Sequence, residues 1–215
     1  MKIKINKFYI LFVIILFSIV LLALSGTIMS QVKEPKFKVI KSHNNLEIRE
    51  YPPVIVAQVI VKGERKKAIS AGFRVLAAYI FGSNVQQKKI SMTAPVIQQE
   101  GEKIVMTAPV IQQESEEVGS WEVRFIMPSE YTLKTLPQPK DSRVELFAIP
   151  SKRYVVIRFS GLASAKSLQK QLEELRKYID SEKLHTIGQP LFAFYNPPWT
   201  LPFLRRNEIM IELKE

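Results

Sequence analysis

Residues 46–81 read LEIREYPPVIVAQVIVKGERKKAISAGFRVLAAYIF, and this stretch decides the fold. Leu46–Glu50 alternates apolar and polar side chains, as a half-buried strand does. Pro52-Pro53 interrupts it, and Val54–Val61 is a run of mainly β-branched residues that favours a second strand. Glu64–Phe81 has the apolar spacing of a helix and ends before a glycine. The stretch therefore predicts strand, turn, strand and helix.

The same order returns in the second part of the chain. Strands are predicted at Val144–Ile149 and Tyr154–Phe159, followed by a helix at Ser164–Asp180. Further strands are predicted at Trp121–Met127, Leu191–Tyr195 and Glu208–Leu213. Runs of strands with one helix per half are typical of the α+β class. We expect a mostly antiparallel sheet curled into a distorted β-barrel, built from two β-β-α-β-β halves with two helices outside it.

A tandem duplication lies between the two predicted halves. Residues 89–100 read KISMTAPVIQQE and residues 103–114 read KIVMTAPVIQQE, so only Ser91 and Val105 differ. Two copies are too few for a solenoid. The duplication predicts a pair of strands joined around residues 100–102.

The amino terminus is unlike the rest of the chain. Residues 8–24 read FYILFVIILFSIVLLAL, and a weaker apolar character continues to Met29. At about 1.5 Å per residue a helix of this length nearly spans a bilayer. We therefore expect a signal anchor in residues 1–30, with residues 8–29 in the membrane. Residues 31–37 are a polar linker, and residues 38–215 form one domain.

Charges around this segment favour an orientation. Lys2, Lys4 and Lys7 precede it, and basic amino termini normally stay in the cytoplasm. The soluble domain is therefore expected outside the cytoplasm. A small-residue pattern at Ala23-Leu24-Ser25 also allows cleavage, after which the domain would be secreted.

Composition excludes several kinds of function. The chain has no cysteine, which excludes disulfides, thiolate metal sites, covalent c-type heme attachment and a cysteine nucleophile. Its net charge of +11 comes from scattered side chains, with no nucleic-acid-binding motif, so no nucleic-acid partner is predicted. There is no HExxH site, GxSxG nucleophile or phosphate loop, so we predict no catalytic residues and a protein that is not an enzyme.

The two predicted helices differ in how much apolar surface they carry. On the second helix the apolar side chains form one narrow stripe, which needs only the sheet as a partner. On the first helix, Ile69, Phe73, Leu76 and Ile80 form a stripe within an apolar arc of about 220°. A ligand, a second subunit or another part of the chain should cover the remainder. Lys66 and Arg74 border the arc, which suits a flat apolar ligand with carboxylates.

A proline-rich loop offers a second candidate binding surface. Tyr195–Glu208 reads YNPPWTLPFLRRNE, and its prolines reduce the entropy lost on ordering a contact. Trp199 and Phe203 offer flat apolar area, and Arg205 and Arg206 can hold carboxylates with forked donors. Alternatively, the aromatic side chains plug the end of the barrel and the arginines are solvated.

This loop, together with LEIREYPP at residues 46–53, the two MTAPV segments and the closing EIMIEL at residues 208–213, resembles the SOUL heme-binding family. The resemblance covers about residues 38–214. It implies a distorted barrel of two similar halves that binds a tetrapyrrole in a groove beside the first helix, near the loop before the last strand. The fold is similar too to gyrase-inhibitor-like effector-binding domains. The residues expected to hold the ligand are Lys66, Ile69, Phe73, Arg74, Leu76, Ile80, Trp199, Phe203, Arg205 and Arg206.

Axial ligation of a heme iron has little support in the sequence. The chain has two histidines, His43 and His185, and both are expected at the surface. Where the family has a proposed histidine ligand on the first strand, this chain has Glu50. Tyr51, Tyr79, Met92 and Met106 are possible substitutes. We therefore predict no metal ligand, and non-covalent binding of heme or another porphyrin through apolar contacts and carboxylate pairing.

An alternative function uses the same helix. The wide apolar face of the first helix could dock a partner protein, a small effector or a second copy of the chain. The sequence leaves the oligomeric state open.

Overall fold

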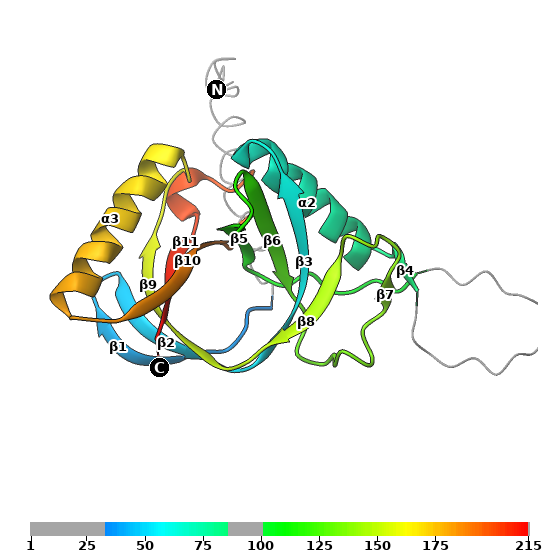
Figure 1. Ribbon diagram of the computed structural model, residues 1–215, viewed down its shortest axis with the longest axis horizontal. Helices are drawn as coiled ribbons and strands as arrows, with labels where there is room; N and C mark the ends of the chain where they lie inside the picture. The colour runs from blue at the N-terminus through cyan, green and yellow to red at the C-terminus, as the bar shows by residue number, and fades with distance from the viewer. Residues whose placement is uncertain (1–32, 86–100, 215) are drawn as a thin grey trace, which may run out of the picture.

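The computed structural model describes residues 33–85 and 101–214 (Figure 1). In chain order, its strands and helices are β1 Lys38–His43, β2 Leu46–Tyr51, β3 Val54–Lys62, α2 Arg65–Ile80, β4 Asn84–Val85, β5 Val110–Glu114, β6 Ser120–Ile126, β7 Gln138–Pro139, β8 Glu145–Ile149, β9 Lys152–Phe159, α3 Ala165–Ser181, β10 Thr186–Phe194, the 3₁₀ helix η1 Pro202–Leu204, and β11 Asn207–Leu213.

Nine of the strands form one antiparallel sheet in the order β1-β2-β9-β11-β10-β5-β6-β3-β8. Strands β4 and β7 form a separate pair. The first and last strands of the large sheet, β1 and β8, do not pair with each other within the described residues. The α+β class is therefore confirmed, but the expectation of a barrel is wrong, because the sheet curls without closing.

The two predicted halves are present in the order of the elements. One is β2-β3-α2-β5-β6 and the other is β8-β9-α3-β10-β11. The halves exchange their first strands, since β2 pairs with β9 and β8 pairs with β3. They also meet at β5 and β10, where Phe192 lies opposite Gln112. In Figure 1 the two helices lie on either side of this seam.

Each helix packs on the sheet of its own half. Helix α2 contacts β3 and β6, and α3 contacts β9 and β11. A Cβ atom on Gly72 would lie 2.7 Å from Val123 Cγ2, so glycine lets α2 approach the sheet closely. Leu175 of α3 is fully buried against Ile157 and Ile209. Apolar spacing along each helix thus determines which face meets the sheet.

The wide apolar arc of α2 is covered mostly by another part of the chain. The segment between β6 and β8 lies beside the helix and contributes the buried Leu136 and Val144. The Tyr79 hydroxyl donates a hydrogen bond to the Pro137 carbonyl oxygen at 2.8 Å and is itself buried. Of the three alternatives drawn from the sequence, coverage by the chain itself therefore accounts for most of the arc, although Phe73 stays 38% exposed.

The predicted pairing of the two copies of the duplication falls partly outside the described residues. The first copy, residues 89–100, lies outside the described residues. The second copy supplies β5, and the two edges of β5 are occupied by β6 and β10. The second copy thus lies at the seam where the two halves of the sheet meet.

The predicted anchor, residues 1–30, also lies outside the described residues. Within residues 33–85 and 101–214, no helix is long and apolar enough to cross a membrane. The end of the predicted linker is attached to the domain, because Lys33 forms a β-bridge with Thr107 and Glu34 pairs with Arg206 at 2.9 Å.

Candidate functional site

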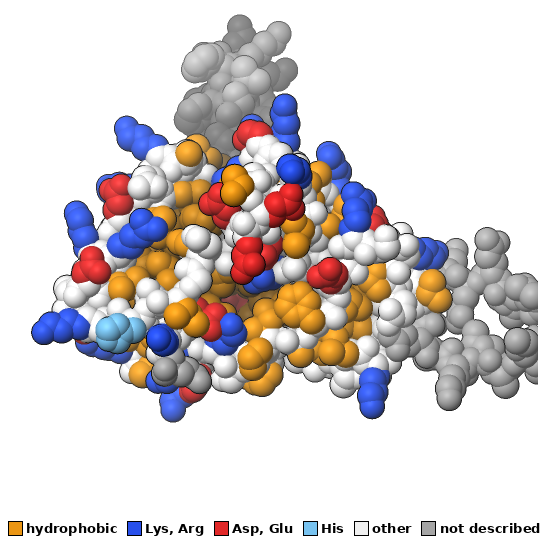
Figure 2. Space-filling model, in the orientation of Figure 1, with side chains coloured by type: hydrophobic (Ala, Val, Ile, Leu, Met, Phe, Trp, Pro, Cys, Tyr) orange, Lys and Arg blue, Asp and Glu red, His pale blue; other side chains and the backbone are white. Residues whose placement is uncertain are grey.

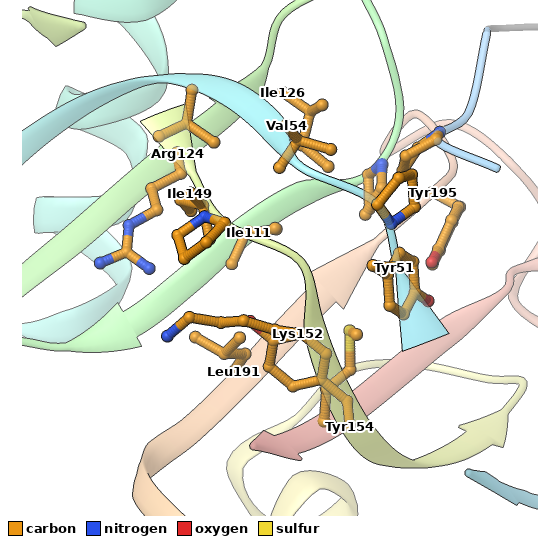
Figure 3. Close-up of a pocket in the computed structure, with 16 residues that line it drawn as sticks. Tyr51, Val54, Ile111, Arg124, Ile126, Ile149, Lys152, Tyr154, Leu191 and Tyr195 are labelled. Atoms are coloured by element: carbon orange, nitrogen blue, oxygen red, sulfur yellow. The ribbon is translucent and has the colours of Figure 1, made fainter. Parts of the chain in front are cut away.

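The sheet faces that point away from the helices enclose a small apolar cleft between the halves. Figure 3 shows Tyr51 and Tyr195 close together at one end and Arg124 and Lys152 at the other. The cavity has a volume of about 50 Å³. Pockets for ligands of drug size have roughly 300–1,000 Å³, so this cleft is too small for a tetrapyrrole.

A buried ion cluster lies beside the cleft, on β2 and β11. Glu208 is fully buried and accepts hydrogen bonds from Arg49 Nη1 at 2.9 Å and Nη2 at 3.2 Å. It also accepts bonds from Arg206 Nε at 2.9 Å and from the Tyr195 hydroxyl at 2.7 Å. Arg49 further donates to the Tyr51 hydroxyl at 3.1 Å. The carboxylate is therefore saturated with donors, which a buried charge requires.

These contacts change the acidities of the groups involved. Burial alone raises the pKa of Glu208, but hydrogen bonds and charge from Arg49 and Arg206 outweigh it, so the pKa lies below its ordinary value. Burial raises the pKa of the Tyr195 hydroxyl, and the nearby Glu208 charge raises it further. Glu208 is therefore ionised and Tyr195 neutral at neutral pH.

The loop between β10 and β11 is held by its own hydrogen bonds. Arg205 Nε donates to the Thr200 carbonyl at 2.7 Å, and a second nitrogen of Arg205 donates to the Pro198 carbonyl. The backbone N–H of Gly161, just before α3, donates to the Pro202 carbonyl at 2.9 Å. The loop is thus tied both to itself and to the start of α3.

Neither arginine predicted to hold carboxylates is free to do so. Arg205 is committed to the loop carbonyls, and Arg206 pairs with Glu34 and Glu208. The Arg206 guanidinium also lies 3.8 Å from the centre of the Tyr195 ring. The alternative that both arginines are solvated is wrong, and carboxylate binding by either would require an exchange of these partners.

The aromatic side chains of the loop point outward. Trp199 is 59% exposed and Phe203 is 70% exposed, so they do not plug the end of the sheet. Figure 2 shows hydrophobic side chains on the face between the two helices, whereas lysine and arginine side chains lie mainly around its outline. A rigid loop with exposed aromatic rings is suited to bind a flat apolar ligand.

The residues predicted on α2 are divided between different environments. Leu76 and Ile80 are buried in the core beneath the helix, and Ile69 packs against the same core. A surface ligand cannot reach Leu76 or Ile80, so the prediction that these two side chains contact the ligand is wrong. Phe73 remains partly exposed and meets Phe125 edge to face, with ring centres 5.4 Å apart.

Lys66 and Arg74 lie elsewhere on the helix. They line a basic hollow of about 600 Å³ together with Lys62 and Lys67. At 100° per residue, Arg74 lies about 100° around the helix from Phe73. The predicted cations therefore do not all face the same way as the exposed aromatic side chain.

The histidines lie away from the loop. His43 stacks on Tyr178 in the last part of α3, and the His185 carbonyl, just beyond α3, accepts a bond from Lys214. The loop, by contrast, is bonded to Gly161 before the first turn of α3. These ends are about 20 Å apart at 1.5 Å per residue.

The other suggested axial ligands are no better placed. The Tyr51 and Tyr79 hydroxyls are engaged by Arg49 and by the Pro137 carbonyl. Met106 is half-buried against the core, and Met92 lies outside the described residues. In the part of the chain that the structure describes, no three His, Cys, Asp or Glu side chains gather as a metal site would require.

Sequence reasoning missed three charged residues of the interior. Arg49 and Glu208 form the buried ion pair, and Arg65 lies half-buried at the seam between the halves. A signal existed for Arg49, because Leu46 and Ile48 alternate with it and place it on the opposite face of β2. No local signal marked Arg65, whose neighbours come from β5, β6 and β10.

Comparison with known proteins places this architecture in context. The sequence pattern of the SOUL heme-binding proteins matches residues 32–101 and 97–212, and these two segments overlap within the tandem duplication. Human heme-binding protein 2 is 30% identical over 173 residues, which cover 77% of this chain and 76% of that protein.

Solved structures share the fold at much lower identity. The C-terminal domain of EcmrR superposes with a TM-score of 0.55 at 12% identity, covering 79% of this chain and 97% of that domain. A protein described as a hydrolase from Listeria innocua gives a TM-score of 0.53 at 13% identity, covering 81% of this chain and 94% of that one. At such identities the likeness establishes the architecture alone.

Proposed function

The chain belongs to the SOUL heme-binding family, and we propose that it binds heme or a related tetrapyrrole non-covalently, to buffer, transport or sequester it. The ligand lies against the loop between β10 and β11 and the exposed side of α2. The groups that contact it are Trp199 and Phe203 of the loop and Phe73 of the helix. The role is binding rather than catalysis.

The observation that supports this proposal best is the contrast within the loop. The Arg205 guanidinium is bonded to carbonyl oxygens of the loop itself, whereas Trp199 and Phe203 are exposed to solvent. Exposing two large aromatic side chains from a rigid loop is unfavourable in water unless something covers them. Because the loop is already ordered, little entropy is lost when a ligand binds.

The iron contributes little to this mode of binding. The described residues offer no free histidine near the loop, and the buried tyrosines already have partners. Affinity for metal-free porphyrin should therefore be close to affinity for heme.

A titration tests the proposal. The full chain in detergent is titrated with hemin and with metal-free protoporphyrin, following porphyrin absorbance and tryptophan quenching. We expect saturable one-to-one binding of both, with affinities within about tenfold of each other, since the proposed site gives the iron no axial ligand. The double variant Trp199→Ala/Phe203→Ala should weaken both equally. Hemin binding a hundredfold more tightly than metal-free protoporphyrin would contradict a site without an axial ligand. Binding of equal strength in the double variant would show that the loop surface does not hold the ligand.

We further propose that residues 8–29 anchor the domain to a membrane, with the domain outside the cytoplasm. The apolar run and the preceding lysines support this. In spheroplasts, added protease should degrade the domain if it lies outside. Protection from protease until lysis would reverse the orientation, and recovery in the soluble fraction would mean cleavage or no anchoring.

A second candidate function is the docking of a partner protein on α2. It is favoured by Phe81, which is 64% exposed at the end of the helix. A stable dimer or complex that Phe81→Asp abolishes, and that porphyrin does not compete with, would support this function over ligand binding.

A further inference from the structure

Arg65, the first residue of α2, lies at the seam where the two halves of the sheet meet. Its guanidinium carbon is 5.3 Å from the centre of the Trp121 ring and 5.4 Å from the centre of the Phe192 ring. Trp121 belongs to β6 of the first half, and Phe192 belongs to β10 of the second. Both halves therefore contribute an aromatic ring to the same cation.

The hydrogen-bonding capacity of Arg65 is largely unused. Within residues 33–85 and 101–214 it forms no salt bridge, and its one side-chain hydrogen bond runs from Nη2 to Gln112 Oε1 at 3.0 Å. A guanidinium carries five N–H donors. Arg206, which is partly buried like Arg65, pairs with Glu208, and so does the fully buried Arg49. Burial lowers the pKa of Arg65 and outweighs the opposing charge of Glu64, whereas the pKa values of Arg49 and Arg206 are raised.

Stacking leaves the useful part of the guanidinium open. Aromatic rings interact with its flat faces, whereas carboxylates bind the N–H groups along its edge. The two interactions are therefore compatible. An anion bound at the edge would complete the coordination of a cation that the protein has already desolvated and oriented.

A hollow of about 260 Å³ adjoins Arg65 between the two helices. Leu168 and Leu172 of α3 and Pro190 of β10 give it apolar walls, and Arg176 adds a second cation. Glu114 is the carboxylate in its lining, so the two arginines leave an excess of positive charge. An apolar body with one anionic group matches this combination.

We propose that the hollow between α2 and α3 binds apolar or aromatic carboxylic acids, with Arg65 holding the carboxylate between Trp121 and Phe192. None of these three residues was predicted from the sequence to hold a ligand. The site is separate from the groups assigned to the tetrapyrrole, and it does not require that the physiological ligand be a tetrapyrrole. Its integrity depends on the correct association of the two halves, because each supplies part of the wall.

The test compares two probes that differ in charge. The full chain in detergent is titrated with pyrenebutyrate and with the uncharged pyrenebutanol, following pyrene fluorescence. We expect the carboxylate to bind at least about tenfold more tightly, because hydrogen bonds to ionised groups are stronger than those to neutral ones. Equal affinities for the two probes would overturn the proposal.

Three variants identify the residue responsible. Arg65→Gln should abolish the preference for pyrenebutyrate, and Arg65→Lys should retain part of it. Lys67→Gln removes an equal charge from the same helix, outside the hollow, and should retain all of the preference. If Arg65→Gln discriminates as the parent does, the proposal fails. Thermal unfolding without probe checks that Arg65→Gln folds. If that variant is unfolded, the reduced preference for pyrenebutyrate is measured in Arg65→Lys instead.

The position of the probe can be checked through tryptophan. The chain contains Trp121 and Trp199 as its two tryptophans, so Trp199→Phe leaves Trp121 as the sole reporter. Pyrenebutyrate should protect Trp121 from acrylamide quenching. Protection of Trp199 instead, measured in Trp121→Phe, would move the binding to the loop.

Hemin titration of Arg65→Gln should match the parent, so failure of the carboxylate site leaves the tetrapyrrole proposal intact.

Discussion

The two halves of the molecule share one order of elements but differ in where they place their charged side chains. Glu208 on β11 and Glu122 on β6 occupy corresponding positions. Each directly precedes a residue whose partner lies in the buried middle of the neighbouring strand, which is β9 for Glu208 and β3 for Glu122. Glu208 is fully buried and bonded to two arginines. Glu122 is only partly buried and has Arg124 of its own strand as its partner.

The difference shows that topology alone does not determine where a buried charge is placed. In the second half, Arg49 reaches Glu208 because β2 has crossed to pair with β9. In the reverse exchange β8 of the second half pairs with β3 of the first, and at this position it supplies Phe147, which lies opposite Val56. The ion cluster therefore joins the chain's first strands to its last strand and secures the loop that carries Trp199.

The largest expected effect is in the substitution Glu208→Gln. It removes the fully buried carboxylate that Arg49 and Arg206 share, which should lower the free energy of unfolding by about 3–5 kcal/mol. The two arginines keep only the more exposed carboxylates of Glu47 and Glu34. The matched variant Glu122→Gln should lower it by less than about 1 kcal/mol, since that pair is partly solvated. Urea unfolding of both variants measures the difference. Equal losses would show that the two halves are not distinguished in this way.

Packing under the helices should give the next largest effect. Leu76→Ala removes a fully buried side chain beneath α2, where the sheet and the β6–β8 segment close around it, and should cost about 3 kcal/mol. Leu172→Ala in α3, where the residue is 8% exposed, should cost less because solvent can reach the space left. Thermal unfolding checks the order, and a reversal would mean that coverage by the segment does not tighten the core.

Acid should weaken the ion cluster around Glu208. The folded pKa of Glu208 is depressed, so its stabilising contribution is present above its ordinary value of 4.5 and is lost as pH falls from there through the folded pKa. The effect is smaller than that of Glu208→Gln, because it depends only on the difference between the two pKa values. Unfolding measured from pH 6 to pH 3 should show a shallower decline in Glu208→Gln. An unchanged slope would exclude Glu208 as its source.

Removing the Tyr79 hydroxyl tests the coverage of α2 by the segment between β6 and β8. Tyr79→Phe removes the bond to the Pro137 carbonyl and should cost about 1 kcal/mol. Hydrogen exchange should then increase in the segment between β6 and β8 and remain unchanged in α3. Protection lost equally in both helices would instead indicate a global effect.

The smallest effect on stability is expected in the loop. Trp199→Ala changes an exposed side chain and should alter the free energy of unfolding by less than about 0.5 kcal/mol, because such positions contribute little to folding. Porphyrin affinity should nevertheless fall by at least about tenfold, since aromatic contacts dominate such surfaces. A large loss of stability with unchanged affinity would assign Trp199 to the core.

Much of the fold could be predicted because its signals are local. Alternation in LEIREY and the apolar spacing of the two helices depend only on neighbouring residues, and β2, β3, α2 and α3 lie within two residues of their expected bounds. The short strand β1 and the pair β4–β7 were missed, since their pairing gives no periodic pattern. The site was predicted less completely. Phe73, Trp199 and Phe203 are exposed as a binding surface requires, but Leu76 and Ile80 are buried and Arg205 and Arg206 have internal partners.

The sequence by itself determined the class of the fold, its two halves, the family and the absence of thiol chemistry, because these follow from residue types and their local order. Tertiary structure decided that the sheet stays open, that the β6–β8 segment covers α2, and which arginines have carboxylate partners. Arg206 and Arg65 are equally basic as residues. One meets Glu208 and Glu34 while the other meets two aromatic rings, because strands distant in the chain bring those neighbours together.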